Sequence, residues 1–185
     1  TFQEFTDMAS SFFNAYKTGN YSLLAEVAEK MRKAISKDDN PPIASLVNTG
    51  VVPHIIKLLD YNFFQFDKLI SECAWIIANV ASSTGKSVAY LMEHGIATRA
   101  INLLEHSDNE VKANALWILG NIAGDDLEYR NVLLENDIVN KLIDMLNGGA
   151  FPPAFVDTAT WLMSNLCRGK PYPPYPVVRK MGLFT

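Results

Sequence analysis

The sequence lacks features that would define several other classes of protein. Its 185 residues include only two cysteines, Cys73 and Cys167, which lie far apart and have no neighbours at metal-ligand spacing. This usage argues against a disulfide framework and is typical of reduced core residues in an intracellular protein. No apolar run reaches the length of a membrane span, and no signal peptide opens the chain. We therefore predict no membrane association and no metal or other cofactor.

A surplus of positive charge is also absent. The net charge is −4 and the isoelectric point is about 5.3, which argues against a general binder of nucleic acid or anionic membranes. Residues in the alternating pattern of strands are few, so we expect no sheet. Apolar residues, by contrast, make up 49% of the chain. This is enough for one domain with a sizeable core over residues 1–185, and it argues against disorder.

An internal repeat organises the chain. The segments "AWIIANVASS" (74–83), "LWILGNIAGD" (116–125) and "TWLMSNLCRG" (160–169) align without gaps, and their tryptophans lie 42 and 44 residues apart. The preceding segments share one apolar pattern, each running from a turn at Gly50, Gly95 or Asp137 into a helix. A period in the low forties in a helical sequence indicates armadillo or HEAT-type repeats. We therefore predict an all-α solenoid with three helices in each unit.

The period also predicts where the units begin and end. We expect a degenerate first repeat at 1–40, full repeats at 41–84, 85–126 and 127–169, and the start of a truncated repeat at 170–185. In the first full repeat, helices are predicted at 41–48, 52–60 and 66–82.

The two ends of the chain differ from the full repeats. The degenerate repeat has the apolar spacing of a third helix within 21–40, on a face made of Leu24, Val27, Ala28, Met31 and Ile35. Terminal repeats are often atypical because they cap the stack. The chain starts with Thr rather than Met and stops within a repeat, so we expect it to be a piece of a longer solenoid. The open last repeat would then allow self-association.

The tryptophans and asparagines of the repeat form two rows in this prediction. Residues four apart lie on one helix face, and stacked third helices place equivalent residues side by side. One row is Trp75, Trp117 and Trp161, and the other is Asn79, Asn121 and Asn165. A buried asparagine is costly unless it is hydrogen-bonded, so we expect the rows to line a concave groove open to water or a ligand.

Such a groove suits an extended basic peptide. An asparagine amide can hold both the N–H and the C=O of a peptide backbone. Slots between neighbouring indoles take the aliphatic stems of Lys or Arg, with a cation–π contribution of about 0.5–2 kcal/mol. Taken singly, each pair also fits a core tryptophan with an incidental asparagine; three pairs in register favour the groove.

The chain resembles the importin alpha family from "NYSLLAEVAEK" onward, most specifically in "NPPI" (40–43), "AWIIANVAS" (74–82), "ALWILGNIAGD" (115–125) and "WLMSNLCRGK" (161–170). The resemblance implies a right-handed superhelical armadillo-repeat solenoid. It also implies a nuclear import adaptor that shuttles between cytoplasm and nucleus and binds basic nuclear localisation signals antiparallel to its repeats. The implied signal-binding residues are Trp75, Asn79, Ser82, Ser83, Asn114, Trp117, Asn121, Asp125, Trp161, Asn165 and Asp38.

The resemblance gives the acids the most specific roles. It implies that Asp125 pairs with the most critical lysine of the signal, and that Asp38 is a second acid at the edge of the groove. Asp125 lies near the negative end of its helix dipole, where a lysine ammonium is favoured. A charge-assisted bond of this kind contributes about 1.5–3 kcal/mol. The alternatives are a solvated helix-end acid for Asp125 and an ordinary polar loop for Asp38.

Some positions depart from the family pattern. Val88 replaces a residue that is typically Thr, and Thr158 stands where an Asn is expected, so we predict altered affinity rather than loss of the site. Arg168 is expected to bound the groove. The family's basic N-terminal segment, which binds importin beta, has no counterpart in residues 1–19, so we expect a groove that is not self-inhibited.

Other functions find less support in the sequence. "SSTGKS" (82–87) lacks the first glycine of a phosphate-binding loop and follows a helix instead of a strand. No catalytic set is formed, and the adjacent acids Asp125 and Asp126 are the nearest enzyme-like pair, so we predict no enzyme. The main alternative is an armadillo scaffold outside nuclear import. Grooves of that kind are lined by Lys and Arg. The positions that flank the asparagines here are Ser82, Ser83, Gly124, Asp125 and Gly169, with Arg168 as the main basic exception.

Overall fold

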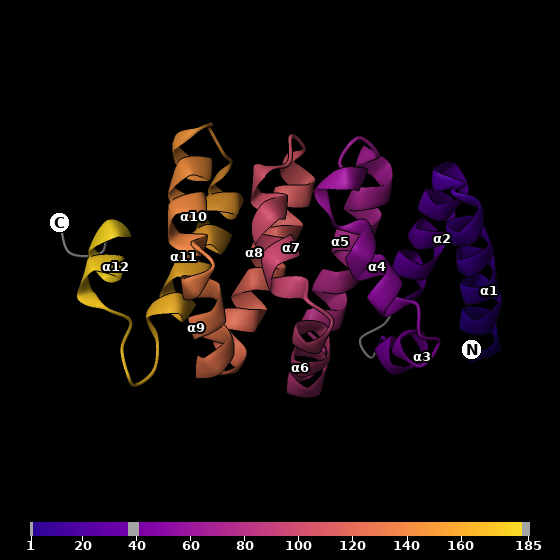
Figure 1. Cartoon of the computed structure of the whole chain (residues 1–185), viewed down its shortest axis with the longest axis horizontal. Coiled ribbons are helices and arrows are strands. Elements are labelled where there is room, and N and C mark those ends of the chain that lie inside the picture. The colour runs from indigo at the N-terminus through magenta and orange to yellow at the C-terminus, as the bar shows by residue number, and fades with distance from the viewer. Residues whose placement is uncertain (1, 37–40, 183–185) are drawn as a thin grey trace.

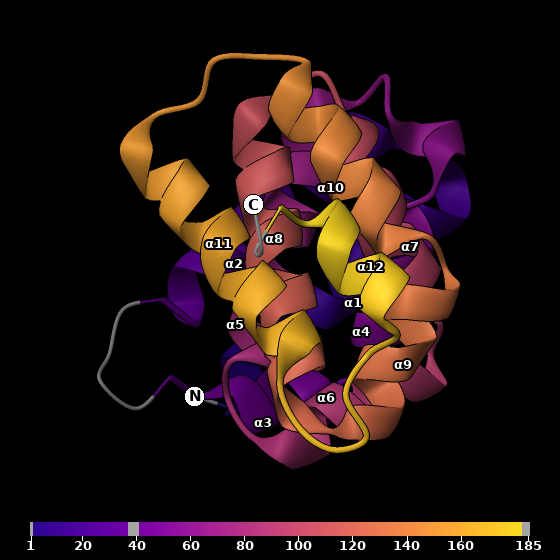
Figure 2. The ribbon, with the colours of Figure 1, turned by 90° about the vertical axis from the view of Figure 1, so that its left-hand side faces the viewer.

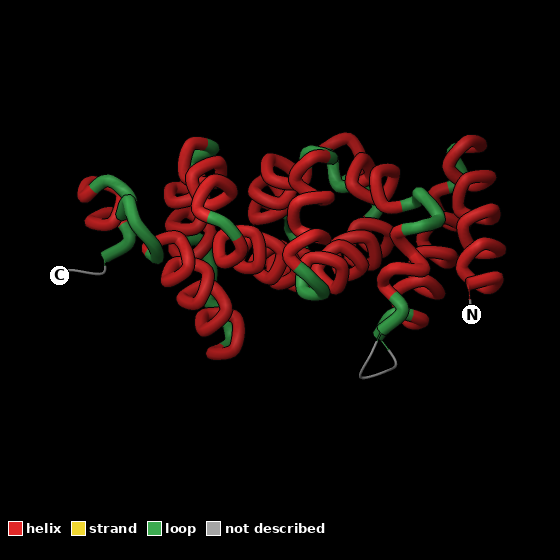
Figure 3. Tube along the Cα trace, turned by 90° about the horizontal axis from the view of Figure 1, so that it is seen from below, coloured by secondary structure: helices red, strands yellow, loops and turns green. Residues whose placement is uncertain are grey.

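The computed structural model describes residues 2–36 and 41–182, and its regular secondary structure within these ranges is helical throughout. Helices follow one another in chain order along an elongated molecule, and short loops join them (Figures 1 and 3). The predicted all-α solenoid is confirmed. None of the helices among the described residues is long and apolar enough to cross a membrane.

Three consecutive units each contain three helices. The first consists of α3 (Ile43–Val47), α4 (Val52–Leu58) and α5 (Asp67–Ala81), with the 3-10 turn η1 (Tyr61–Phe63) between the last two. The second consists of α6 (Gly85–Glu93), α7 (Ile96–Asn102) with the 3-10 turn η2 (Leu103–Glu105), and α8 (Asn109–Asp125). The third consists of α9 (Leu127–Glu135), α10 (Ile138–Asn147) and α11 (Pro153–Cys167). The helices predicted in the first full repeat are therefore present, each slightly shorter than expected; the exact repeat boundaries stay a prediction.

Further helices lie at both ends of this stack. Before the units, α1 (Phe2–Thr18) packs against α2 (Tyr21–Ala34), and after them comes the short α12 (Tyr175–Lys180). The apolar face predicted for residues 21–40 is confirmed, because Leu24, Ala28 and Met31 are fully buried. The repeat pattern predicts no helix at residues 2–18. There α1 covers the outer side of α2 with Phe5, Phe12 and other buried side chains.

The third helices of the units form one side of the stack. Successive contacts join α2 to α5, α5 to α8 and α8 to α11. Viewed along the stack, these four helices lie on one side, and α4, α7 and α10 lie on the other (Figure 2). One broad face of α5 is buried, with Ile70, Ile76 and Val80 all at 0% exposure. Equivalent side chains of the third helices are thus brought into rows.

The turns between first and second helices repeat in conformation as well as in sequence. Gly50 and Gly95 have φ angles of +76° and +77°, and Asp137, at the equivalent position, has φ of +61°. Glycine adopts this left-handed region without steric cost, and aspartate is one of the few other residues that tolerate it. The turn residues singled out by the repeat therefore set the direction of each second helix.

The two cysteines lie in different environments. Cys73 is completely buried in α5, and burial raises the pKa of its thiol. Cys167 is half-buried at the end of α11, with its Sγ 3.7 Å from Met181 Sδ. Both are free thiols, but only Cys73 is a core residue as predicted.

Candidate functional site

The first two tryptophans form an open slot on the third helices. Trp75 and Trp117 are 41% and 50% exposed, which is unusual for so large an apolar side chain. Between them lies a hollow of about 380 Å³, here called the tryptophan slot. It is lined by Trp75, Ala78, Asn79, Ser82, Asn114, Trp117 and Asn121. Six of the predicted site residues therefore line one hollow.

The second pair of tryptophans is arranged differently. The rings of Trp117 and Trp161 are in contact, with centroids 5.3 Å apart and planes at 49°. Trp161 lies against Gly120 of α8, where an added Cβ would come within 2.0 Å of the indole. The prediction of a slot between every neighbouring pair is wrong here, because Gly120 lets Trp161 sink onto α8. In the first pair, Ala78 stands at the position equivalent to Gly120.

The three asparagines also differ from a uniform exposed row. Asn79 donates from Nδ2 to Ser36 Oγ at 3.2 Å, and Asn121 donates to the carbonyl of Trp117 at 2.8 Å. Asn165 is buried, at 2% exposure, and donates to the carbonyl of Gly120 at 2.9 Å. The expectation that all three amides face water is therefore wrong for Asn165. Its Oδ1 is also buried and has no hydrogen-bond partner among the described residues.

Asp125 lies in a second hollow, of about 300 Å³, here called the acidic hollow. The hollow is also lined by Thr84, Gly85, Val88, Asn121, Trp161, Asn165 and Arg168, among others. The carboxylate approaches the start of α6, since a Cβ added to Gly85 would lie 3.0 Å from Asp125 Oδ1. Partial burial, and next the charge of Asp126, raise the pKa of Asp125. Within residues 2–36 and 41–182 the structure shows no ion pair for Asp125, so its negative charge is uncompensated by contact.

The remaining predicted residues lie around these two hollows or outside the described part of the chain. Ser82 lines both hollows and donates to the carbonyl of Asn79 at 2.9 Å. Ser83 donates to the carbonyl of Val80 and lies 2.8 Å from Ser87 Oγ. The predicted acid Asp38 and its neighbour Asp39 fall outside the described residues.

The positions that depart from the family pattern are accounted for in part. Val88 is 2% exposed and contributes an apolar wall to the acidic hollow, where a Thr would offer a hydroxyl. Thr158 donates to the carbonyl of Ala154 within its own helix. Arg168 lines the acidic hollow, in agreement with its expected place at the groove boundary.

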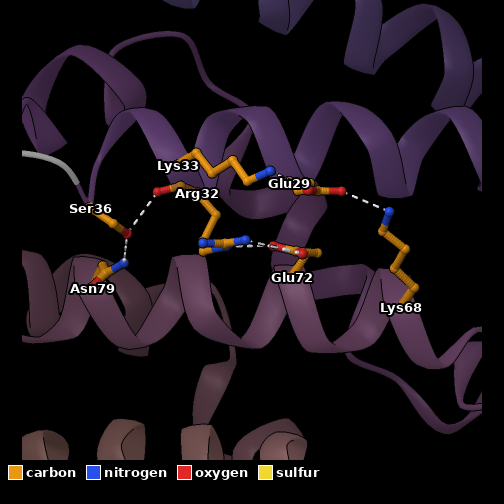
Figure 4. A network of polar contacts seen from close by, with 7 residues as sticks. All are labelled: Glu29, Arg32, Lys33, Ser36, Lys68, Glu72 and Asn79. Carbon is orange, nitrogen blue, oxygen red and sulfur yellow. Dashed lines mark hydrogen bonds and ion pairs between the residues drawn. The ribbon is translucent and has the colours of Figure 1, made fainter.

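A network of ion pairs joins α2 to α5 beside Trp75. The guanidinium of Arg32 lies 4.4 Å from the ring centroid of Trp75. It pairs with Glu72 at 2.7 Å (Figure 4). Glu29 contacts both Lys33 and Lys68, and these two lysines lower its pKa to about 2. The pairs of Arg32 with Glu72 and of Lys68 with Glu29 join helices some 40 residues apart, so they leave no local signal in the sequence. The arrangement shows that the outer face of Trp75 accepts a guanidinium.

The described residues hold no group of three or more His, Cys, Asp or Glu side chains suited to a metal ion. The described residues of the two hollows thus offer indole faces, amides, hydroxyls, the unpaired carboxylate of Asp125 and, at the boundary, the guanidinium of Arg168. These groups favour a ligand that is cationic, has aliphatic stems and offers backbone N–H and C=O groups.

The chain is similar to known armadillo-repeat proteins in both sequence and fold. The family model for the armadillo/beta-catenin-like repeat matches residues 86–124. A designed armadillo repeat protein in complex with the peptide (KR)4 has a TM-score of 0.70 at 22% identity, covering 98% of this chain and 78% of that one. A structure of computationally designed armadillo repeat proteins for modular peptide recognition has a TM-score of 0.76 at 21% identity. The match covers 95% of this chain and 68% of that one. The chain is an armadillo-repeat protein.

Its sequence relatives narrow this class to one family. Importin subunit alpha-2 of Arabidopsis thaliana is 37% identical over 85% of this chain, and importin subunit alpha-1b of Oryza sativa subsp. japonica is 34% identical over 89%. A probable importin subunit alpha-A of Dictyostelium discoideum is 36% identical over 80%. The repeats of this chain belong to the importin alpha family. The chain spans 29–30% of the length of these relatives.

Proposed function

We propose that this chain binds Lys- and Arg-rich peptides in extended form, as the signal-binding part of a nuclear import adaptor. The observation that carries the proposal is the combination of an exposed tryptophan slot with an adjoining hollow that holds the unpaired carboxylate of Asp125. The two hollows share Ser82 and Asn121, so one short peptide can occupy both.

Each part of the groove has a task in this proposal. Asp125 takes the ammonium of one lysine in the acidic hollow, and Asn121, which lines both hollows, is placed to contact the peptide backbone between them. The slot between Trp75 and Trp117 takes the stem of a second basic side chain. Arg32 on the outer face of Trp75 supports this, because it shows a guanidinium stacked on the same indole.

The relatives support the cellular role. They are named as importin alpha subunits, so we propose that the cargo peptides are nuclear localisation signals and that the protein shuttles between cytoplasm and nucleus. The designed armadillo protein bound to (KR)4 supports an alternating basic peptide as a ligand type for this fold.

A fluorescence anisotropy titration tests the proposal. The probe is a labelled peptide with a Lys-Lys-x-Lys core, titrated at low and at physiological salt. Asp125→Lys and Trp117→Ala should each weaken binding at least tenfold, which corresponds to about 1.4 kcal/mol.

The matched controls are Glu135→Lys and Tyr175→Ala, exposed positions that line neither hollow. Both should leave the affinity within about twofold of the unaltered chain. Binding that all four substitutions change equally, or that salt alone abolishes, would reduce the interaction to diffuse attraction. Absence of binding would leave an armadillo scaffold with another partner.

A further inference from the structure

A third and larger hollow adjoins the groove. It has a volume of about 780 Å³ and lies between α3 and the turn from α5 to α6; we call it the α3 hollow. Its apolar walls are Pro41, Ile43, Ala44, Val47 and Tyr90. It shares Asn79 and Ser82 with the tryptophan slot, and Ser82 and Thr84 with the acidic hollow. The three hollows therefore form one continuous surface.

The α3 hollow occupies the place of the acidic hollow one repeat earlier. The alignment of Trp75 with Trp117 sets Asn79 against Asn121 and Ser83 against Asp125. Asn79 and Ser83 line the α3 hollow as Asn121 and Asp125 line the acidic one. The repeat thus presents the same position twice, once with a carboxylate and once with a hydroxyl.

The α3 hollow differs from its counterpart in its charged residues, because the acidic hollow is lined by Asp125 together with Arg168. Lys86 is the one charged side chain among the described residues that line it. A peptide lysine or arginine placed here would meet a like charge and no carboxylate from those residues. An aliphatic side chain would instead cover the apolar walls, and removing apolar surface from water is favourable.

The spacing of side chains along an extended peptide indicates which residue would face the α3 hollow when a lysine occupies the acidic hollow. Side chains of an extended chain alternate between its two sides, with about 6.6 Å between every second residue. Neighbouring helices are spaced by about 8–10 Å. Trp75 lies one turn before Asn79 in α5, and Ser83 follows Asn79 by four residues, just past the end of that helix. The tryptophan slot and the α3 hollow therefore lie on opposite sides of Asn79, which lines both. The residue two positions from the lysine in the acidic hollow is the nearest one on the same side of the peptide, so its side chain best matches the equivalent hollow one repeat away.

We propose that the α3 hollow is a subsite for an aliphatic side chain of the bound peptide, two positions from the lysine paired with Asp125. The preferred ligand is then a basic peptide interrupted by Leu, Ile, Val or Met, with a Lys-Lys-Leu-Lys core as its simplest form. This inference rests on the proposed function and goes beyond it, since it sets the sequence preference within basic peptides.

The test compares three labelled peptides that differ only at x of Lys-Lys-x-Lys, with Leu, Lys or Gly at that position. At physiological salt the Leu peptide should bind at least fivefold more tightly than either of the others. Lys86→Glu should reverse the order of the Leu and Lys peptides. Lys57→Glu, an equal charge change at an exposed site outside the hollow, should preserve it.

Val47→Asp provides a second test, because it places a carboxylate in the apolar wall. It should remove the preference for Leu while the Gly peptide keeps its affinity. Equal binding of the three peptides, or tightest binding of the Lys peptide with no specific effect of Lys86→Glu, would overturn the subsite and leave the proposed function standing. Failure of all three peptides to bind would overturn both.

Discussion

At the scale of single residues, Asp125 is the acid in the candidate site whose ionisation should respond most directly to a basic ligand. Burial and the neighbouring Asp126 raise the pKa of its carboxyl in the free protein. A lysine ammonium in contact would lower that pKa again, because an opposite charge favours the ionised form. Ligand binding and proton release are therefore coupled at this residue.

The first prediction concerns the pH dependence of peptide binding. Affinity for the Lys-Lys-x-Lys peptide should be constant near neutral pH and should fall as the pH is lowered through the raised pKa of Asp125, since protonation removes the partner of the lysine. Titrations between pH 7.5 and 4.5 measure this. Asp125→Asn should bind weakly throughout and lack the fall, and an unchanged pH profile in this variant would contradict the role of Asp125.

The same pKa shift makes a second prediction, about stability. When the pKa of a carboxyl is higher in the folded than in the unfolded state, the folded protein loses stability as the pH rises through the interval between the two pKa values. At neutral pH the ionised Asp125 therefore destabilises the fold. Asp125→Asn should raise the midpoint of chemical denaturation at pH 7 while it weakens peptide binding. A lower midpoint would show that the carboxylate has a stabilising partner.

At the scale of elements, the packing of α11 on α8 depends on the absence of a side chain. Gly120 is in the interior of α8, where alanine is ordinarily favoured by about 1 kcal/mol. The added Cβ would lie 2.0 Å from Trp161. Overpacking of this kind typically costs about 1–3 kcal/mol, so the steric effect outweighs the gain in helix propensity.

Gly120→Ala is accordingly predicted to lower the free energy of unfolding, by up to about 2 kcal/mol. In a chain that already carries Trp161→Ala, the same substitution should be neutral or stabilising, because the indole is gone. Denaturation of the two single variants and the double variant completes the cycle. Equal effects of Gly120→Ala in both backgrounds would rule out the contact as the cause.

The junction of α2 with α5 makes a fourth prediction. Arg32 pairs with Glu72 and covers Trp75, and Glu72 raises the pKa of Arg32 further. Its side chain is only 15% exposed, so Arg32→Met should lower the free energy of unfolding by about 1–3 kcal/mol. Arg32→Lys should recover part of that loss. Thermal denaturation of both variants measures it, and equal losses would show that the charge contributes nothing.

These elements also show what the sequence could and could not predict. The tryptophan period predicts α5, α8 and α11 correctly. Each of these helices has apolar residues at helical spacing within its own segment, so its position can be predicted from local sequence alone. The depth of Trp161 and Asn165 was not predictable in the same way. It depends on Gly120 and Gly124 of the preceding repeat, whose lack of side chains admits the indole and the amide. Similarly, the pair of Arg32 with Glu72 depends on how α2 and α5 are placed relative to each other.

At the scale of the whole molecule, each third helix packs against the third helices of the neighbouring units in the stack. In such a solenoid, stability is close to a sum of units and nearest-neighbour interfaces. The central helices α5 and α8 have third-helix neighbours on both sides, whereas α1 and α12 lie at the ends of the described structure (Figure 1). Local opening should therefore cost least at the ends.

Amide hydrogen exchange measures this fifth prediction. Protection should be greatest in α5 and α8 and should decrease towards α1 and α12. Uniform protection along the chain would indicate all-or-none opening and would contradict the additive description.

The central claim, that a basic peptide lies across the tryptophan row, is tested most directly by the three indole N–H resonances. The chain has three tryptophans, and all three lie at the groove. In a titration with the Lys-Lys-Leu-Lys peptide, followed by proton–nitrogen correlation spectra, the indole signals of Trp75, Trp117 and Trp161 should shift together with one saturation curve. Indole signals that stay in place while the peptide binds would contradict the account, because the ligand would then occupy another surface.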